Sequence, residues 1–430
     1  MRGFFFGYIW IMEKKLVTRA LIIANFLPFF VFPSTRVLDI DTWRLLLFSV
    51  INTISLSYIF LVPDLKKIFN DIIRSKISLS IAAFIVWGFI SYLYALNGNE
   101  VILRSFTFVN FYISFISMYV FISFNKFKAI TISIFMLIVV SCEMIFSYSA
   151  YIEISRSVQY TFDFNNFLNG NFPNRNITSA IYLVQLPFVL HVLKNTDSKI
   201  LKIITSIIAF LLVYMIFMLG SRTAYVILIC LFLAYLIVLA VSNNKKIKSY
   251  FLTFVILVSS SFVMSTFTLG TQSDAFVVNR IQTIDFNEQS TNTRLRYYQY
   301  GLEQLINSPI IGVGLGNWKI VSIERDKENI IRYLVPYTMH NDFLEVASEL
   351  GVIGLFIFIS IFYFGFKNSW DVYSRNKVDP KFLIIPFCIL IYIIDSNFNF
   401  PFTRISQLFH LALFLALSEY FNNNTNENTA

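Results

Sequence analysis

Long apolar runs, separated by short segments that carry the charges, constrain this sequence most. We identify twelve runs, at residues 16–33, 44–62, 77–96, 105–124, 129–149, 177–193, 200–219, 223–241, 249–269, 343–366, 382–394 and 404–421. A helix needs about 20 apolar residues to cross a hydrocarbon core of about 30 Å. Hydrophobic residues make up 57% of the chain and charged residues 14%, which excludes an ordinary soluble domain. The sequence therefore predicts an all-α integral membrane protein with about 12 transmembrane helices, of which the short run at 382–394 is the weakest.

Basic residues are distributed unevenly between the two sides of these runs. With the N-terminus placed in the cytoplasm, 20 of the 34 lysines and arginines face the cytoplasm, and 16 of these 20 are lysines. Of the 14 on the opposite side, 12 are arginines. The positive-inside rule accounts for the net charge of +9 without a nucleic-acid partner, and it places both termini in the cytoplasm. Because a guanidinium binds phosphate bidentately, the outer face is predicted to bind anions; anchoring of lipid headgroups is an equal alternative for any single arginine.

The cysteines and the N-terminal run add no further site or domain. Cys142, Cys230 and Cys388 lie inside expected spans, with neither a disulfide framework nor a metal-ligand spacing, so we expect packing residues and no metal site. The apolar run at 3–10 is too short to span a membrane, and no cleavage pattern follows it. We expect no cleaved signal peptide, and Met12 is an alternative start of translation.

Two outer connections are long, at residues 150–176 and 270–342, and long loops in compact proteins are usually functional or disordered. In the second, apolar residues at helical spacing predict an amphipathic helix on the membrane surface, or an ordinary loop helix: Leu295, Tyr298, Leu302, Leu305 and Ile306. We divide the chain into five parts: spans one to five with the first outer loop (1–176), spans six to nine (177–269), the large outer loop (270–342), spans ten to twelve (343–421) and a polar tail expected to be disordered (422–430).

His340, one of three histidines, stands where the large outer loop enters a span. Histidine is the side chain best suited to proton transfer near neutral pH. Asp342 and Glu345 fit a capping box, and helix initiation is the interpretation that we favour for them. The N-terminus of that helix would favour a phosphate. For His191 and His410, near an inner boundary and inside the last span, we expect packing or a satisfied hydrogen bond.

Two other motifs bring arginines to the outer boundary. Residues 219–224 (LGSRTA) form a turn between spans, with Arg222 at or just below the membrane surface, where an ionisable group is a functional candidate. Residues 290–296 (STNTRLR) open the amphipathic segment with Arg294 and Arg296, and residues 308–318 (SPIIGVGLGNW) close it. The glycine spacing of the second run is typical of a nucleotide loop, but the strand and helix context is missing, so we discard that interpretation.

Four segments, in this order, resemble the O-antigen ligase and O-antigen polymerase family of lipid-linked glycan transferases: 170–190 (GNFPNRNITSAIYLVQLPFVL), 219–224, 293–318 and 340–356 (HNDFLEVASELGVIGLF). The resemblance covers roughly residues 170–365, and the first five spans carry none of its motifs. It implies a glycosyltransferase C-like helical membrane fold with the active site under the large periplasmic loop.

The resemblance also implies roles for single residues. Arg222 and Arg294 would bind the substrate pyrophosphate, with Arg296 as a neighbour of lower weight, and His340 would be the catalytic residue. Asn176 corresponds to a recurrent asparagine with a structural role. The implied reaction is inverting and needs no metal, nucleotide or other cofactor. It transfers a glycan from undecaprenyl pyrophosphate to an acceptor hydroxyl, at the periplasmic face of the bacterial inner membrane.

The acceptor stays open at this point. Lipid A-core would make the protein a ligase, which we favour; a second carrier-linked glycan would make it a polymerase, and a protein acceptor is a third option. A flippase or other transporter of lipid-linked glycan is the alternative from a different class. A transporter should carry charges and broken helices near the bilayer midplane, whereas the informative residues here lie at the outer boundary. We further expect Arg222, Arg294 and His340 to converge on one outer cavity.

Overall fold

The computed structural model describes residues 2–30, 40–155, 164–242, 244–270, 289–330, 337–376 and 379–427, and the regular structure in these ranges is helical. Its main helices are α1 (Arg2–Ala24), α2 (Ile40–Leu61), α3 (Pro63–Ile72), α4 (Lys76–Ile90), α5 (Gly98–Asn125), α6 (Ala129–Ser155), α7 (Phe164–Phe167), α8 (Arg175–Asn195), α9 (Lys199–Leu219), α10 (Arg222–Ser242), α11 (Lys245–Leu269), α13 (Gln289–Asn307), α14 (Trp318–Asp326), α15 (Asp342–Arg375), α16 (Ile384–Asp395) and α17 (Ile405–Glu427).

Nine helices of the described residues are long and apolar enough to cross a membrane: α2, α4 with its following turn, α5, α6, α8, α9, α10, α11 and α15. This finding fits the predicted helical integral membrane protein. The other three expected spans correspond to α1, α16 and α17, and the total of twelve stays a prediction. Charges interrupt α1, where Lys14 pairs with Asp64 at 2.7 Å, and α16 has only 12 residues.

The helix α17 is less apolar because it lies inside the bundle rather than against lipid. Several of its polar side chains are buried and hydrogen-bonded within the protein, as expected for polar groups in a membrane helix. Ser418 donates to the carbonyl of Gly365 at 2.7 Å, and the Nδ1 of His410 lies 2.8 Å from the carbonyl of Ser406. The Nδ1 of His191, on α8, lies 3.1 Å from the hydroxyl of Tyr250. Both histidines therefore have the satisfied hydrogen bonds that we predicted.

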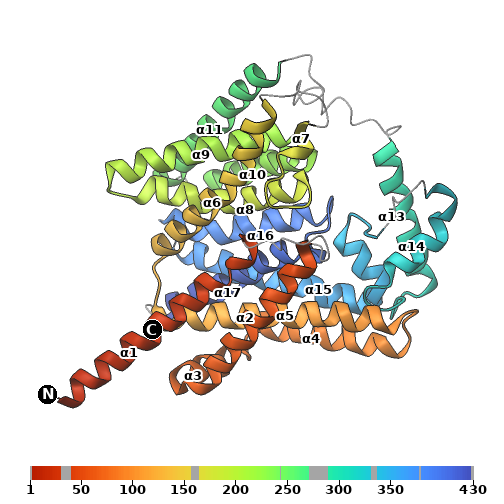
Figure 1. The fold of residues 1–430 in the computed structure, drawn as a ribbon, viewed down its shortest axis with the longest axis horizontal. Helices are drawn as coiled ribbons and strands as arrows, with labels where there is room; N and C mark the ends of the chain where they lie inside the picture. The colour runs from red at the N-terminus through yellow and green to blue at the C-terminus, as the bar shows by residue number, and fades with distance from the viewer. Residues whose placement is uncertain are drawn as a thin grey trace.

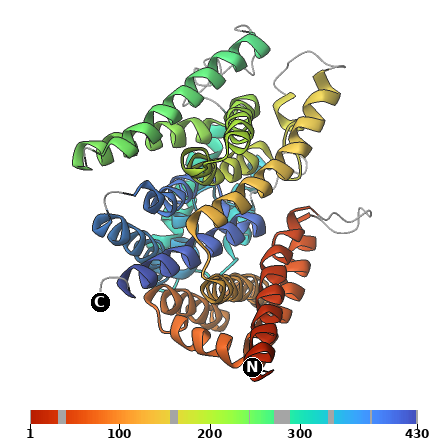
Figure 2. The same cartoon turned by 90° about the vertical axis from the view of Figure 1, so that its left-hand side faces the viewer.

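The C-terminal helices form the centre of the molecule. Figure 1 shows α16 and α17, in blue, between the N-terminal helices on one side and the helices of the middle of the chain on the other, and Figure 2 shows the same order after a quarter turn. Accordingly, α17 packs against α5 and α15, and α16 packs against α8. The short helices α13 and α14 lie together at one end of this bundle (Figure 1). We call this end of the bundle the loop end.

The predicted span at 343–366 is interrupted at its start. Gly351 has a φ of 66° and a ψ of −171°, which breaks α15 into a short helix before it and a membrane-length helix after it. At the break, three carbonyls and one N–H of α15 have no partner within the helix, and residues outside it supply their hydrogen bonds. Val313 and Gly314 donate to the carbonyls of residues 348 and 349, the Trp87 indole donates to that of residue 350, and the N–H of residue 352 donates to Pro309. The glycine-rich run at 308–318 therefore has a structural role, which is to complete this break.

The polar C-terminal tail is helical as far as it is described. The helix α17 continues to Glu427, whereas we expected disorder from residue 422. The amide of Asn423 donates to the hydroxyl of Tyr119 on α5 at 2.8 Å. This tie to the bundle extends the helix beyond the apolar run. Residues 428–430 lie outside the described residues.

Candidate functional site

His340 precedes α15 at the loop end and is held by its surroundings. Its imidazole packs edge-on against the ring of Phe400 at 4.8 Å, and its carbonyl accepts a hydrogen bond from the hydroxyl of Tyr298 at 3.1 Å. Its φ of 61° is unusual for a residue with a side chain, and such backbone strain clusters at functional sites. Within the described residues, its Nδ1 is buried and has no hydrogen-bond partner. A ligand that reaches Nδ1 would supply the hydrogen-bond partner that this nitrogen lacks.

Two arginines act on the charge of this ring. Burial first, and then the positive charges of Arg294 and Arg404, lower the pKa of His340 to about 3. Arg294 lies on α13, one turn before the Tyr298 whose hydroxyl contacts His340. The structure thus brings together the predicted residues His340 and Arg294. At neutral pH the imidazole is uncharged, which is the state that accepts a proton.

Arg404, one of the 12 outer arginines, is the second cation that acts on His340. It lies between α16 and α17, and its guanidinium covers the ring of Phe400 at 4.7 Å, against which His340 also packs. Its Nη1 donates to Asp41 at 2.6 Å, and the opposite carboxylate oxygen of Asp41 lies 3.7 Å from Arg44. Within the described residues, the Nε of Arg404 is buried without a hydrogen-bond partner. No sequence motif marks Arg404, because only the fold brings the end of the chain to residue 340.

Arg222 lies at the same end of the bundle as His340. The end of α8 and the segment at 379–381 line one cavity at the opposite end, so α9 must return to the loop end, where α10 begins with Arg222. Gly220, with a φ of 63°, ends α9 and makes the tight turn between the two helices. Convergence of Arg222 on the ring of His340 stays a prediction.

The other predicted site residues are engaged in structural contacts. Arg296 donates to both carboxylate oxygens of Asp326 at 2.6 and 3.2 Å, which ties α13 to α14. These hydrogen bonds raise the pKa of Arg296. The N–H of Asn176 donates to Asn174, which is the N-cap of α8. Asn176 therefore lies in the first turn of that helix.

The acidic pair after His340 does help to form the start of α15, but with a different arrangement from the predicted capping box. Asn341, rather than Asp342, is the N-cap, and its side chain accepts from the N–H of Leu344 at 3.1 Å. Asp342 instead accepts from the N–H of Phe402 at 3.0 Å, and Glu345 accepts from that of Met339 at 2.7 Å. Both carboxylates therefore hold the loops around His340 in place.

The predicted surface helix is α13, and its apolar residues face two ways. Leu295, Leu302 and Ile306 are exposed, as expected of a face turned to the membrane surface. The opposite face carries Tyr297, which is buried in a small cluster with Trp318, Val321 and Met339. This second face, which the sequence pattern did not reveal, fixes Arg294 relative to His340.

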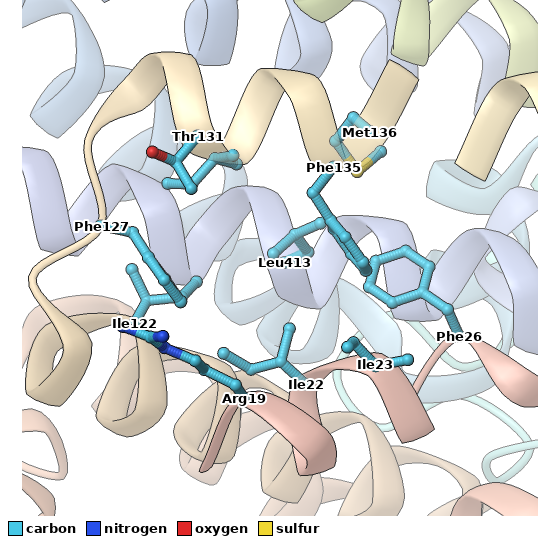
Figure 3. A pocket seen from close by; sticks show the side chains of 11 residues that line it. Arg19, Ile22, Ile23, Phe26, Ile122, Phe127, Thr131, Phe135, Met136 and Leu413 are labelled. Carbon is cyan, nitrogen blue, oxygen red and sulfur yellow. The ribbon is translucent and has the colours of Figure 1, made fainter. Parts of the chain in front are cut away.

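An apolar slot of about 200 Å³ lies between α1, α5, α6 and α17 (Figure 3). In this view Phe26 and Phe135 lie side by side, with their rings in edge-on contact at 4.8 Å, and among the described residues of the lining Arg19 is the charged one. The guanidinium of Arg19 already donates to Asn125 at 3.0 Å. A slot with this lining lacks the groups needed for proton transfer, so we do not assign the reaction to it.

Comparison with protein families identifies the segment that carries these residues. Residues 207–359 match the model of a family described as O-antigen ligase. This match supports the resemblance of the segment to the O-antigen ligase superfamily. No curated protein matches the chain. The matched segment contains Arg222, Arg294 and His340, whereas Arg404 and Asn176 lie outside it.

The family match over residues 207–359 confirms the predicted resemblance. It indicates a glycosyltransferase-like enzyme of the membrane, with an O-antigen ligase or polymerase type of function and lipid-linked glycans as substrates. The nine apolar helices agree with a membrane location.

Proposed function

We propose that this protein transfers a glycan from undecaprenyl pyrophosphate to a hydroxyl of lipid A-core, at the periplasmic face of the bacterial inner membrane. The observation that carries the proposal is the neutral His340, with a free ring nitrogen, in the electrostatic field of Arg294. The reaction needs both features at one place: an acceptor for the proton of a hydroxyl, and cations for a departing pyrophosphate. The family match supports the reaction class.

The proposed reaction is a single displacement. The acceptor oxygen attacks the anomeric carbon of the glycan, the bond from that carbon to the pyrophosphate oxygen breaks, and the configuration inverts. The proton of the acceptor hydroxyl passes to His340, and the carrier pyrophosphate leaves with the bonding electron pair. Arg222 and Arg294 stabilise its negative charge. The phosphate leaving group supplies the driving force, so the chain needs no metal or nucleotide for this step.

Electrostatics favour this division of roles. Burial, and then the two positive charges, keep the imidazole of His340 unprotonated at neutral pH. Because the same effects make it a weak base, its uptake of a proton depends on the bound pyrophosphate, whose negative charge offsets the two cations. The same charges gain most from an incoming pyrophosphate in a site from which water is largely excluded. Arg404, which pairs with Asp41 and packs over the Phe400 ring, contributes to this field.

Substitution of His340 tests its role. We expect H340A to slow transfer by roughly 10² to 10⁴ fold with carrier lipid still bound, as for loss of a general base. H340Q separates two roles, because an amide orients a hydroxyl but does not accept its proton. Transfer would be followed in detergent with purified acceptor, a chelator and matched protein amounts. Near-normal turnover of H340Q refutes the base role, and full activity of H340A removes His340 from the site.

Variants of Arg222 and Arg294 should lose transfer for a different reason than variants of His340. R222K and R294K keep the charge but lose the planar fork that holds a phosphate bidentately, so we expect a sharp loss of transfer. R325K is the matched control, because Arg325 lies at the same end but pairs with Glu303 at 2.6 Å. If the two test variants transfer as well as R325K, the assignment to the pyrophosphate is wrong.

The nature of the acceptor is tested by offering two candidate acceptors to the protein. With one donor preparation, lipid A-core and a second carrier-linked glycan are offered in parallel. Product on lipid A-core supports the ligase, whereas extension of the carrier-linked glycan supports the polymerase of the same superfamily. Movement of intact donor across a vesicle membrane without covalent transfer would support the flippase alternative and contradict the proposal.

A further inference from the structure

A polar cavity of about 330 Å³ lies at the loop end next to the segment that carries His340. Tyr337 and Thr338, which precede His340 by two and three residues, are part of its wall. Its volume lies within the range of about 300 to 1,000 Å³ that is usual for small-molecule sites. Its charged lining consists of Asp41, Glu100, Arg104, Lys319, Glu345 and Glu349.

Two carboxylates of this cavity are held rigidly. Glu345 and Glu349 are only 7% and 4% exposed. Glu345 accepts the N–H of Met339 at 2.7 Å, and Glu349 accepts that of Trp318 at 2.8 Å. Their positions are thus fixed by backbone on both sides of the cavity, so they form a preorganised wall rather than a mobile surface cluster.

Cations stand opposite these acids. Arg104 packs its guanidinium over Phe108 at 5.4 Å, and its charge acts on Glu345 and Glu349. In the described part of the chain, this guanidinium makes no hydrogen bond or ion pair, although it lines the cavity. Lys319 pairs with Glu100 at 2.6 Å. A ligand in the cavity therefore meets both acceptors and donors, and Arg104 has donors to offer it.

The balance of these groups identifies the kind of ligand. Asp41 already pairs with Arg404 at 2.6 Å and Glu100 with Lys319 at 2.6 Å, so the lining is close to balanced in charge, with Arg104 beside two buried glutamates. A neutral molecule with many hydroxyls can donate to the acids and accept from Arg104, whereas a phosphate would also meet the two glutamates. Thr107 and Thr403 add hydroxyl groups to the wall. We propose that this cavity binds a sugar unit of a glycan substrate, placed next to His340. The inference rests on the proposed transfer reaction, and it adds the position of a saccharide subsite.

The two walls of the cavity come from different parts of the chain. Lys319, Glu345 and Glu349 belong to the segment that matches the family model, whereas Asp41 and Arg104 belong to α2 and α5, outside it. The matched segment would therefore supply the reacting groups together with one wall. The N-terminal helices would determine which sugar is accepted.

Sugar binding is tested without any transfer reaction. The full-length protein in nanodiscs is mixed with free hexoses and N-acetylhexosamines, and binding is measured by saturation-transfer NMR, with inorganic phosphate as competitor. We expect at least one sugar to bind, phosphate not to compete, and R104M and K319M each to weaken binding by about tenfold or more, as for loss of a charged hydrogen bond. R325M is the matched control and should bind as the unmodified protein does. Absence of sugar binding, competition by phosphate, or equal binding by R104M and R325M overturns the inference.

The transfer assay then decides which substrate provides the sugar. If the cavity holds the acceptor, R104M raises the KM for acceptor by about tenfold and leaves that for donor unchanged; if it holds the donor sugar, the reverse is expected. A change of less than twofold in both values contradicts a subsite on either substrate. Failure of the proposed function is distinguishable, because it would appear as sugar binding in the NMR experiment without transfer by the unmodified protein.

Discussion

Substitution of Gly351 by alanine tests the break in α15 that positions the residues around His340. A Cβ at Gly351 would lie 2.1 Å from the carbonyl oxygen of Ile310, far inside van der Waals contact. The backbone, with a φ of 66° and a ψ of −171°, is also in a region that glycine adopts almost alone. The variant therefore combines backbone strain with a collision against the turn at 308–318.

Gly270 separates these two effects. It has a φ of 72° and a ψ of 150°, a similar glycine conformation, but a Cβ there meets no atom of the described residues within 4 Å. We expect G270A to lose about 1 to 3 kcal/mol of unfolding free energy from strain alone. In G351A the turn must also withdraw, which breaks its hydrogen bonds to residues 349 and 352 and costs roughly another 2 to 4 kcal/mol. The expected loss for G351A is therefore about 3 to 7 kcal/mol.

The measurement is unfolding of both purified variants in mixed detergent micelles, with the unmodified protein alongside. Transfer activity is measured below the unfolding transition. G351A should lose activity there as well, because Glu349 and the segment before His340 shift with the turn. Equal destabilisation of the two variants, within about 0.5 kcal/mol, would refute the reasoning, since the expected difference rests on the collision with residues 310 and 311 and on the hydrogen bonds that the turn then loses.

Three further predictions concern pH, a supporting hydrogen bond and topology. Because the pKa of His340 is lowered to about 3, its ring gains a proton only as the pH falls toward that value, so the transfer rate should show no limb near pH 6.5; such a limb, if abolished in H340Q, contradicts the assignment. Y298F should destabilise the protein by about 1 kcal/mol and lower transfer, since it removes the hydrogen bond to the carbonyl of His340, and Y300F on the same helix is the control. A reporter fused after Lys246 should be cytoplasmic and one after Gln289 periplasmic; both on one side would exclude the proposed topology.

The sequence alone was sufficient for the membrane class, because the apolar runs are long and the solvent preference of a side chain is a local property. The motifs beside His340, Arg222 and Arg294 are also local, so the sequence alone can propose these three as site residues. The number of membrane-spanning helices is harder to predict from the sequence. The polar residues of α17 lower its hydropathy, and only burial among α5, α15 and α16 explains why they are tolerated.

Tertiary structure alone decided which residues surround His340. Arg404 follows it by 64 positions and Asp41 precedes it by 299, and no periodicity or motif connects them. The same applies to Arg104, whose place opposite Glu345 and Glu349 depends on the packing of α5 near the start of α15. Local patterns report the preference of each segment for lipid, helix or turn. The field around a buried imidazole depends on charges brought near it by packing, so it is a property of the folded chain.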